Sequence, residues 1–298
     1  MNAETLQIFV TVAEQKNFSR AAKLLHLSQP GVSLHIRNLE QELDAKLFHR
    51  SPQQVKLTEA GGLLYERAKR ILSLMEEARE SIHSLQGEVT GSLKLGASFT
   101  IGEYLLPRVL AEFAAPHPRV DIEVTIGNTG EIVQGVRDNA LDLGWIEGET
   151  AYPELTVEPV MQDDMILIAS PDHPLALERS VPPERLNDQV WVLRELGSGT
   201  RAVSDRFIGS YDLRMQRTFV LNSSQGVKEA VAAGLGIAML SRWTVRKELE
   251  SGDVSRIPLS CGRILRDFAL IQRKDAADSL AKRKFIQYLM AFAAEHTI

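Results

Sequence analysis

The spacing of apolar residues changes near Gly91, and this change constrains the fold of the 298-residue chain more than any other feature. Before Gly91, one proline-free stretch repeats apolar residues at alternating spacings of four and three: Leu64, Ala68, Ile71, Met75, Ala78, Ile82 and Leu85. After Gly91, short apolar runs of strand length alternate with helical segments. The first pattern is typical of a long helix, and the second favours an α/β sheet.

The proline-free stretch is predicted to be one helix over residues 58–90. Its apolar stripe is narrow and follows the 4-3 spacing of a coiled-coil seam. We therefore expect this helix to link the two parts of the chain and to pair with the same helix of a second copy. The alternative is an amphipathic helix that packs on its own domain.

Residues 1–57 show the pattern of three short helices followed by a hairpin. Ser19 is expected to cap the second helix. The third helix begins around Pro30, because proline suits the first turn of a helix. It carries one apolar stripe, made of Val32, Ile36, Leu39 and Leu43. Residues 44–57 become extended on both sides of a polar turn, which predicts a small β-hairpin, or wing.

The start of the third helix carries the side chains best suited to reading DNA. With the apolar stripe buried, its exposed face comprises Gln29, Pro30, Ser33, Leu34 and Arg37. Gln can pair with adenine, Ser with several bases, an apolar side chain with a thymine methyl group, and Arg with guanine or phosphate. The wing adds His49, Arg50 and Lys56 for contacts to phosphates or the minor groove. The alternative is a helical domain that binds protein through an ordinary polar face.

The charge distribution agrees with a DNA-binding N-terminal part. Residues 1–57 hold seven Lys and Arg against five Asp and Glu, a net charge of +2. The other residues carry 27 against 34, a net charge of −7, so the overall −5 hides a basic head on an acidic body. The single cysteine, Cys261, excludes an intramolecular disulfide and favours a reducing cytoplasm. We expect no membrane-spanning helix, because no run of about 18 apolar residues is present.

The α/β part places hydroxyl-bearing side chains in the turns that lead from strands into helices. These residues are Ser98, Thr100, Thr129, Ser198 and Thr200. Helix N-termini offer free N–H groups, and ligands of open α/β sheets lie off the carboxyl ends of strands. Together with Arg201, which can add charge-assisted hydrogen bonds, these turns predict a cleft for a small anionic effector. The alternative for each turn is ordinary helix capping without a ligand.

The N-terminal residues resemble the LysR-type transcriptional regulators nearly position by position. The motif comprises Phe9-Val10, Ser19-Arg20-Ala21-Ala22, Leu27-Ser28-Gln29-Pro30-Gly31-Val32-Ser33, Ile36-Arg37, Leu39-Glu40, Leu47-Phe48 and Leu57-Thr58-Glu59-Ala60-Gly61. Asp44 departs from the pattern, since the family usually has glycine there. Asp tolerates a left-handed backbone better than most residues, so we expect the turn to survive. The alternation after residue 91 matches the second part of the family in size and order.

The resemblance implies an α/β fold class with three parts: a winged helix-turn-helix (1–57), a long linker helix (58–90) and a two-lobed, periplasmic-binding-protein-like effector domain (91–298). Lobe one would comprise residues 91–163 plus 267–298, and lobe two residues 164–266. The effector would bind between the lobes. The resemblance further implies a cytoplasmic homodimer or homotetramer, with promoter DNA and RNA polymerase as partners and without a cofactor, a metal or a catalytic residue.

Three stretches are similar to a narrower branch, the CysL-like regulators of sulphur metabolism: 96–107, 126–129 and 195–201. This similarity implies sulfite, sulfate or a related anion as the effector. Regulators of carbon fixation share the Gly-Ser-Gly-Thr-Arg run and sense phosphorylated metabolites, so both effector classes stay open. An enzyme is one alternative, but the chain lacks the common nucleophile-elbow, zinc-protease and phosphate-loop motifs. A free solute-binding protein is another, and it would leave residues 1–57 without a role.

Overall fold

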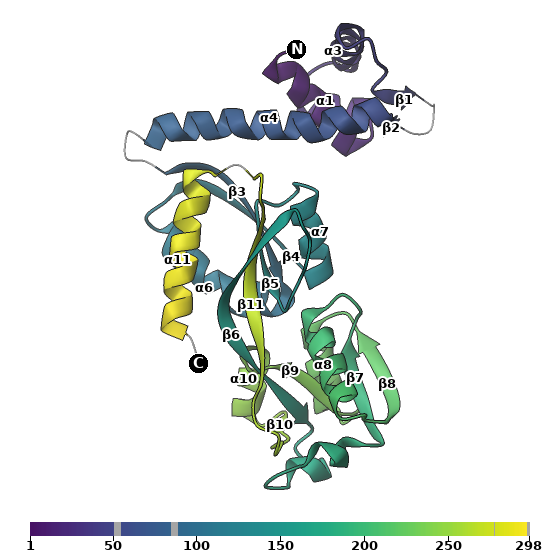
Figure 1. The fold of residues 1–298 in the computed structure, drawn as a ribbon, viewed down its shortest axis with the longest axis vertical. Helices are drawn as coiled ribbons and strands as arrows, with labels where there is room; N and C mark the ends of the chain where they lie inside the picture. The colour runs from purple at the N-terminus through teal and green to yellow at the C-terminus, as the bar shows by residue number, and fades with distance from the viewer. Residues whose placement is uncertain (51–54, 85–88, 277, 297–298) are drawn as a thin grey trace. The chain divides into compact units, whose positions relative to one another are not determined.

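The computed structural model divides the chain into two compact units (Figure 1). The residues that it describes are 1–50, 55–84, 89–276 and 278–296. The first unit comprises Met1–Gly87 with Ala277–Ser279, and the second comprises Glu88–Ala276 with Leu280–Ile298. Within the described ranges, no helix has both the length and the hydropathy needed to cross a membrane.

The first unit packs three helices and a hairpin around one hydrophobic core. Its elements are α1 (Ala3–Gln15), α2 (Phe18–Leu24), α3 (Gln29–Glu42), β1 (Phe48–Arg50) and β2 (Val55–Leu57). Phe9 from α1, Ala22 from α2 and Ile36 from α3 meet in this core. The predicted order of three helices and a wing is confirmed, and β1 pairs antiparallel with β2. The polar turn of the wing, residues 51–54, lies outside the described residues.

Two details of this head differ from the sequence prediction. Asn17, not Ser19, caps α2, because its side-chain oxygen accepts a backbone hydrogen bond at 3.0 Å from the N–H three residues later. Leu43 follows the last residue of α3 and is 40% exposed, so the buried stripe ends at Leu39. As expected, Asp44 adopts the left-handed conformation, with φ of 47°.

The helix α4 (Glu59–Ser84) belongs partly to the head. Thr58 precedes its first residue, and the Thr58 hydroxyl accepts a hydrogen bond from the Gly61 N–H at 3.0 Å. Ala68 is completely buried in the head core, and Leu64 packs against the same core. The prediction that Ala68 takes part in an intermolecular seam is therefore wrong, because its own domain already covers it.

The C-terminal part of α4 exposes the rest of the predicted seam. Ile71, Met75 and Ile82 are 37%, 41% and 64% exposed, and Ala78 is exposed as well. An apolar helix face of this kind is expected on a surface that a second helix covers. Leu85, the last residue of the predicted seam, lies outside the described residues.

The second unit is an α/β domain. Its first elements are β3 (Thr90–Ser98), α5 (Phe99–Tyr104), α6 (Leu106–Ala114), β4 (Arg119–Gly127), α7 (Thr129–Arg137), β5 (Leu143–Glu147) and β6 (Leu155–Ala169). The remaining ones are two short 3-10 turns (Pro174–Ala176 and Pro183–Leu186), β7 (Gln189–Arg194), α8 (Gly199–Ser210), β8 (Met215–Leu221), α9 (Ser224–Ala232), β9 (Ala238–Ser241), α10 (Arg242–Ser251), β10 (Ser255–Arg256), β11 (Ile264–Arg273) and α11 (Leu280–His296). The main sheet has the order β10-β6-β11-β5-β3-β4, with β9 also beside β6, and β7 pairs with β8 in parallel.

The long strands β6 and β11 join the two halves of this domain (Figure 1). They pair antiparallel along their length, with a register shift between Phe268 and Ala269. Met161 and Phe268 belong to a core that α11 helps to cover, whereas Met165 belongs to a core with β7 and α8. These two cores therefore meet along this stretch of β6 and β11.

Some elements extend or divide in ways that local apolar spacing does not indicate. β6 has an uninterrupted apolar run only over residues 165–169, because Pro159 and the polar residues before Met165 interrupt it, yet the strand begins at Leu155. α5 and α6 are two separate helices, and Pro107 lies in the first turn of the second. The highly charged α10 was not predicted at all.

Candidate effector cleft and nucleic-acid interface

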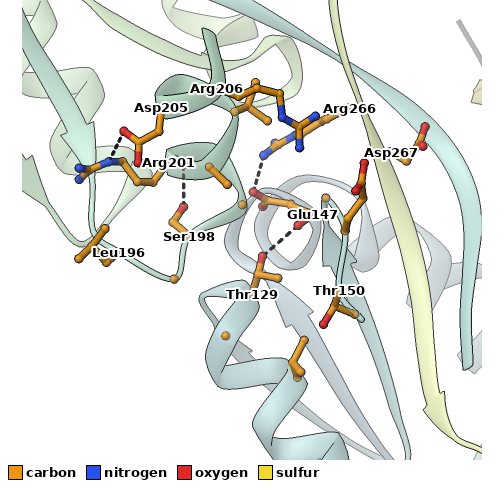
Figure 2. Close-up of a pocket in the computed structure, with 18 of the residues that line it drawn as sticks. Thr129, Glu147, Thr150, Leu196, Ser198, Arg201, Asp205, Arg206, Arg266 and Asp267 are labelled. Atoms are coloured by element: carbon orange, nitrogen blue, oxygen red, sulfur yellow. Dashed lines mark hydrogen bonds and ion pairs between the residues drawn. The ribbon is translucent and has the colours of Figure 1, made fainter. Parts of the chain in front are cut away.

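A cavity of about 490 Å³ lies where β5, β11 and the N-terminal ends of α7 and α8 come together (Figure 2). Its lining includes Thr129, Glu147, Ser198, Arg201 and Arg266. Three of these residues were predicted as effector ligands from the sequence, and the structure brings them into one cavity. The other two, Glu147 and Arg266, change the electrostatics of the cleft.

Glu147, the last residue of β5, is a buried carboxylate at one wall of the cavity. Its Oε1 accepts a hydrogen bond from the Thr100 N–H at 2.8 Å, at the start of α5. Its Oε2 accepts one from the Thr200 hydroxyl at 3.1 Å and one from Arg266 Nη1 at 2.6 Å. Burial alone would raise the pKa of Glu147, but Arg266 and these hydrogen bonds hold the pKa below its ordinary value. The carboxylate is therefore charged in the folded protein.

Arg266 connects Glu147 on β5 to Asp163 on β6. Its Nε donates to Asp163 Oδ2 at 2.8 Å, and its Nη2 donates to the Thr100 hydroxyl at 3.2 Å. Asp163 Oδ1 also accepts a hydrogen bond from the Ser241 hydroxyl at 2.7 Å. Burial raises the pKa of Asp163, although Arg266 and Ser241 favour its charged form and lower the pKa in part. The pKa of Arg266 is raised by the two carboxylates, although burial alone would lower it. One guanidinium thus bridges two buried carboxylates on different strands.

The N-terminal ends of α7 and α8 both line the cavity and contact each other. The Gly130 N–H donates to the Gly197 carbonyl oxygen at 3.1 Å. Gly197 has a φ of +90°, a left-handed conformation that favours glycine. Gly199 lies so close to Glu147 that a Cβ atom there would be 2.5 Å from the Glu147 carbonyl oxygen. These glycines allow the backbone of α8 to approach β5 and α7 directly.

Two further arginines line the cavity on α8. Arg201 donates to Asp205 Oδ1 at 2.8 Å and to the Arg194 carbonyl oxygen at 3.0 Å. The Arg206 guanidinium makes no hydrogen bond or ion pair with any residue that the structure describes. In the cavity, the Arg201 guanidinium is therefore held by hydrogen bonds to the protein. The Arg206 guanidinium has no such partner among the described residues.

The predicted DNA-reading face lies on the first turns of α3. The Ser28 hydroxyl caps this helix by accepting a hydrogen bond from the Gly31 N–H at 3.2 Å. Gln29, Pro30, Leu34 and Arg37 are exposed, and Ser33 is half-buried. Gln29 Nε2 donates to the Ser33 hydroxyl at 3.0 Å, so these two side chains are held together.

A buried carboxylate supports the wing beside this helix. Glu40 Oε1 accepts hydrogen bonds from the Leu47 N–H at 3.0 Å and the Phe48 N–H at 3.5 Å, and Lys46 pairs with its other oxygen at 3.1 Å. Burial opposes ionisation, but these donors lower the pKa of Glu40 below its ordinary value. Lys56 in β2 is exposed, whereas nothing is described of the Arg50 side chain.

Two family descriptions match the chain. Residues 3–62 match "Bacterial regulatory helix-turn-helix protein, lysR family", and residues 86–294 match "LysR substrate binding domain". The chain belongs to the LysR family of transcriptional regulators. It is a DNA-binding regulator with an effector-binding domain, and the family consists of regulators and not of enzymes.

Similar proteins agree with this membership of the LysR family. CysL of Bacillus subtilis is 41% identical over 97% of both chains, and CfxR of Cupriavidus necator is 34% identical over 97% of this chain and 91% of that one. A full-length OxyR variant from Pseudomonas aeruginosa covers 98% of this chain and 94% of its own, with a TM-score of 0.78 and 25% identity. The match to the regulatory domain of Synechocystis CcmR in complex with 2-PG covers 70% of this chain and 100% of that domain. Its TM-score is 0.66 and its identity is 27%.

The effector domain of this LysR-type regulator uses some predicted ligands internally. Thr100 and Thr200 are buried and hydrogen-bonded to Glu147 and Arg266, so their hydroxyls already have partners. Thr129 donates to the Glu147 carbonyl oxygen at 3.2 Å. Ser198 caps α8. Ser98 is buried with a hydroxyl that has no hydrogen-bond partner in the described part of the chain.

Sequence reasoning missed Arg266 and Asp163. The available signal was a charged residue inside an otherwise apolar strand pattern, which is rare without a buried partner. Trp145, on β5, lies in the core and not in the cavity lining. Glu195 pairs with Arg194 at 2.8 Å.

Proposed function

We propose that this LysR-type regulator binds a small anionic effector in the cavity beside Glu147 and responds by changing the geometry of its promoter complex. The observation that carries the proposal is a cavity lined by elements of both proposed lobes, where the N-termini of α7 and α8 meet. An effector that prefers one arrangement of the lobes shifts the population toward it. To change the ratio of the two lobe arrangements from 1:99 to 99:1, the effector must bind one arrangement about 5.5 kcal/mol more tightly than the other. A smaller difference in affinity already shifts the populations enough to alter promoter binding.

The helix N-termini and the arginines of the cavity support an anionic effector. Helix N-termini favour negative charge, and Arg201 and Arg206 add guanidinium groups. Glu149 and Asp267 also line the cavity, and Asp205 is paired with Arg201. The effector would bind next to the Arg266–Glu147 pair and not directly on Arg266, because Glu147 and Asp163 already occupy that guanidinium. Thr129, Ser198 and Arg201 line the cavity and remain the proposed effector ligands. Ser98, Thr100 and Thr200 are buried outside its lining, and Thr100 and Thr200 would act only through their hydrogen bonds with Glu147 and Arg266.

Sulphur oxyanions are our first candidates for the effector. The similarity to CysL supports sulfite or sulfate, whereas the CcmR complex with 2-PG supports a phosphorylated carboxylate. Isothermal titration of the full-length protein with sulfite, sulfate and 2-PG separates these possibilities. We expect one anion to bind and Arg206→Met to weaken it, while Arg214→Met, an exposed arginine paired with Asp188, should not. No heat from any of the three would reject these candidates.

The DNA-binding part acts through α3 in the major groove. Gln29, Pro30, Ser33, Leu34 and Arg37 would contact the bases, and Arg50 and Lys56 would contact phosphates. Two heads joined by the α4 seam would require a site with two half-sites, and a homotetramer would extend it. Leu64, Ile71, Met75, Ala78 and Ile82 remain the proposed dimerisation residues.

Footprinting on the promoter upstream of the gene tests both parts together. We expect two protected half-sites, and a changed spacing or extent of protection when the effector is added. Gln29→Ala should lower the affinity for this promoter by about 1–3 kcal/mol, the usual cost of a lost base contact, with little effect on binding to random DNA. Equal affinity for promoter and random fragments would contradict the assignment of α3 as the reading helix.

A further inference from the structure

A second cavity, of about 420 Å³, lies in the effector domain on β6, α10 and β11. Its lining comprises Asp163, Asp164, Arg242, Trp243, Arg246, Glu250 and Arg263. It shares no lining residue with the cleft described above. We propose that this cavity is a second binding site, and that its ligand is a small carboxylate that also carries a hydroxyl group.

The charge of the cavity favours an anion. Three guanidinium groups line it, and α10 begins at Arg242, so the positive end of that helix also lies here. Asp163 already accepts hydrogen bonds from Arg266 and Ser241. Of the three carboxylates in the lining, Asp164 and Glu250 are the two that face the three arginines without this engagement.

The three arginines form no short ion pairs with the carboxylates of the cavity among the described residues. Arg263 and Arg242 approach Asp164 Oδ2 only to 3.5 and 3.8 Å, without forming a hydrogen bond. Arg246 has no ion pair with any residue in the described ranges. Guanidinium groups bind carboxylates through pairs of parallel hydrogen bonds, and these three retain the donors for that.

Asp164 supplies the reason for the hydroxyl group. The residue is 3% exposed, and its Oδ1 has no hydrogen-bond donor among the described residues. A buried carboxylate oxygen without a donor is costly, so a ligand that brings a donor gains from it. A hydroxycarboxylate such as glycolate offers its carboxylate to the arginines and its hydroxyl to Asp164, whereas acetate offers only the carboxylate.

The position of the cavity connects it to the buried network of the cleft. The Trp243 N–H donates to the Ser241 hydroxyl at 3.1 Å, and that hydroxyl donates to Asp163 at 2.7 Å. Asp163 in turn holds Arg266. A ligand beside Trp243 and Asp163 would therefore contact residues that are hydrogen-bonded to β6 and β11, the strands that join the lobes.

Tryptophan fluorescence of the full-length protein provides the test. Trp243 lines the cavity, whereas Trp145 and Trp191 are buried at 2% and 0% exposure. We expect glycolate at low ionic strength to change the emission in a saturable way, and acetate to bind more weakly. Arg263→Met and Arg246→Met should each lower the affinity for glycolate about ten-fold or more, which corresponds to the loss of one charge-assisted hydrogen bond.

Three controls make the outcome decisive. Arg214→Met removes an exposed arginine elsewhere and should leave the glycolate titration unchanged. Arg206→Met alters only the cleft, so a titration unchanged in this variant separates the two sites. Trp243→Phe should abolish the signal. The proposal is overturned if glycolate gives no saturable change, or if neither Arg263→Met nor Arg246→Met weakens it; the effector cleft would be unaffected by that result.

Discussion

At the scale of single residues, Arg266 is the side chain on which the effector domain most depends. It is the cation between Glu147 and Asp163, and all three are buried. Removing one partner of a buried ion pair leaves an uncompensated charge, which costs more than the pair itself contributes. The arrangement is therefore stable only when it is complete.

Substitution of Arg266 tests this dependence. We expect Arg266→Met to lower the free energy of unfolding by about 3–5 kcal/mol in urea denaturation, because two carboxylates lose their cation. Combining Arg266→Met with Glu147→Gln should reduce that loss, since one buried charge is then absent. A loss below about 1 kcal/mol in the single variant would contradict the buried network.

Glu147 gives the same network a pH dependence. Its pKa in the folded protein is lower than its ordinary value of 4.5, so its contribution to stability is complete above that value and is lost as the pH falls through the folded pKa. Asp163 acts in the opposite direction, because its pKa is raised and protonation helps folding. We expect Glu147→Gln to flatten the loss of stability below pH 4.5, measured by urea denaturation at several pH values. An unchanged pH profile would argue against a charged Glu147.

At the scale of elements, α4 divides into a part that stabilises the head and a part available to a partner. Ala68 is buried in the head, whereas Ile71 is 37% exposed three residues later. The same apolar repeat therefore serves two purposes along one helix. Substitutions at neighbouring positions should have different consequences.

Ile71→Asp and Ala68→Asp distinguish the two parts of α4. We expect Ile71→Asp to convert dimers to monomers in light scattering while the head stays folded, because a charge in an apolar seam opposes association. Ala68→Asp should instead unfold the head, since it buries a charge in the core. The exposed Ser73→Asp serves as a matched control. A dimeric Ile71→Asp would refute the proposed seam.

At the scale of the whole molecule, the shape of the proposed effector cleft depends on how closely α8 approaches β5. Gly199 allows this approach, because a Cβ atom there would be 2.5 Å from a backbone oxygen of Glu147. Gly209 lies in the same helix with nothing within 4 Å of its position for a Cβ. The two glycines form a matched pair for substitution.

Gly199→Ala should push α8 away from β5 and disturb the cleft. We expect a larger radius of gyration of the full-length protein by X-ray scattering and a weaker effector affinity in isothermal titration. Gly209→Ala should change neither, and should stabilise slightly because alanine favours helix. Equal behaviour of the two variants would show that close approach at Gly199 is not required.

Most of the fold was predictable from local patterns. The α3 stripe, the wing and the alternation after Gly91 follow from spacing rules that operate within about fifteen residues. The errors lie where local and tertiary forces differ. Ser19 and Asn17 are both good helix caps, and the choice between them depends on where the chain turns. Likewise β6 continues through polar residues because β11 satisfies its backbone hydrogen bonds.

The cleft was predictable only in outline. Hydroxyl-rich turns marked its position, since strand ends and helix starts recur in sequence. That Thr100 and Thr200 bind Glu147, and that Arg266 bridges Glu147 and Asp163, depends on residues separated by up to 119 positions. Periodicity carries no information about which charges meet across such distances. The local spacing of apolar residues thus determines the order of helices and strands. The pairing of buried charges is decided only by the tertiary structure, because packing removes water from each ion and each ion then requires a specific partner.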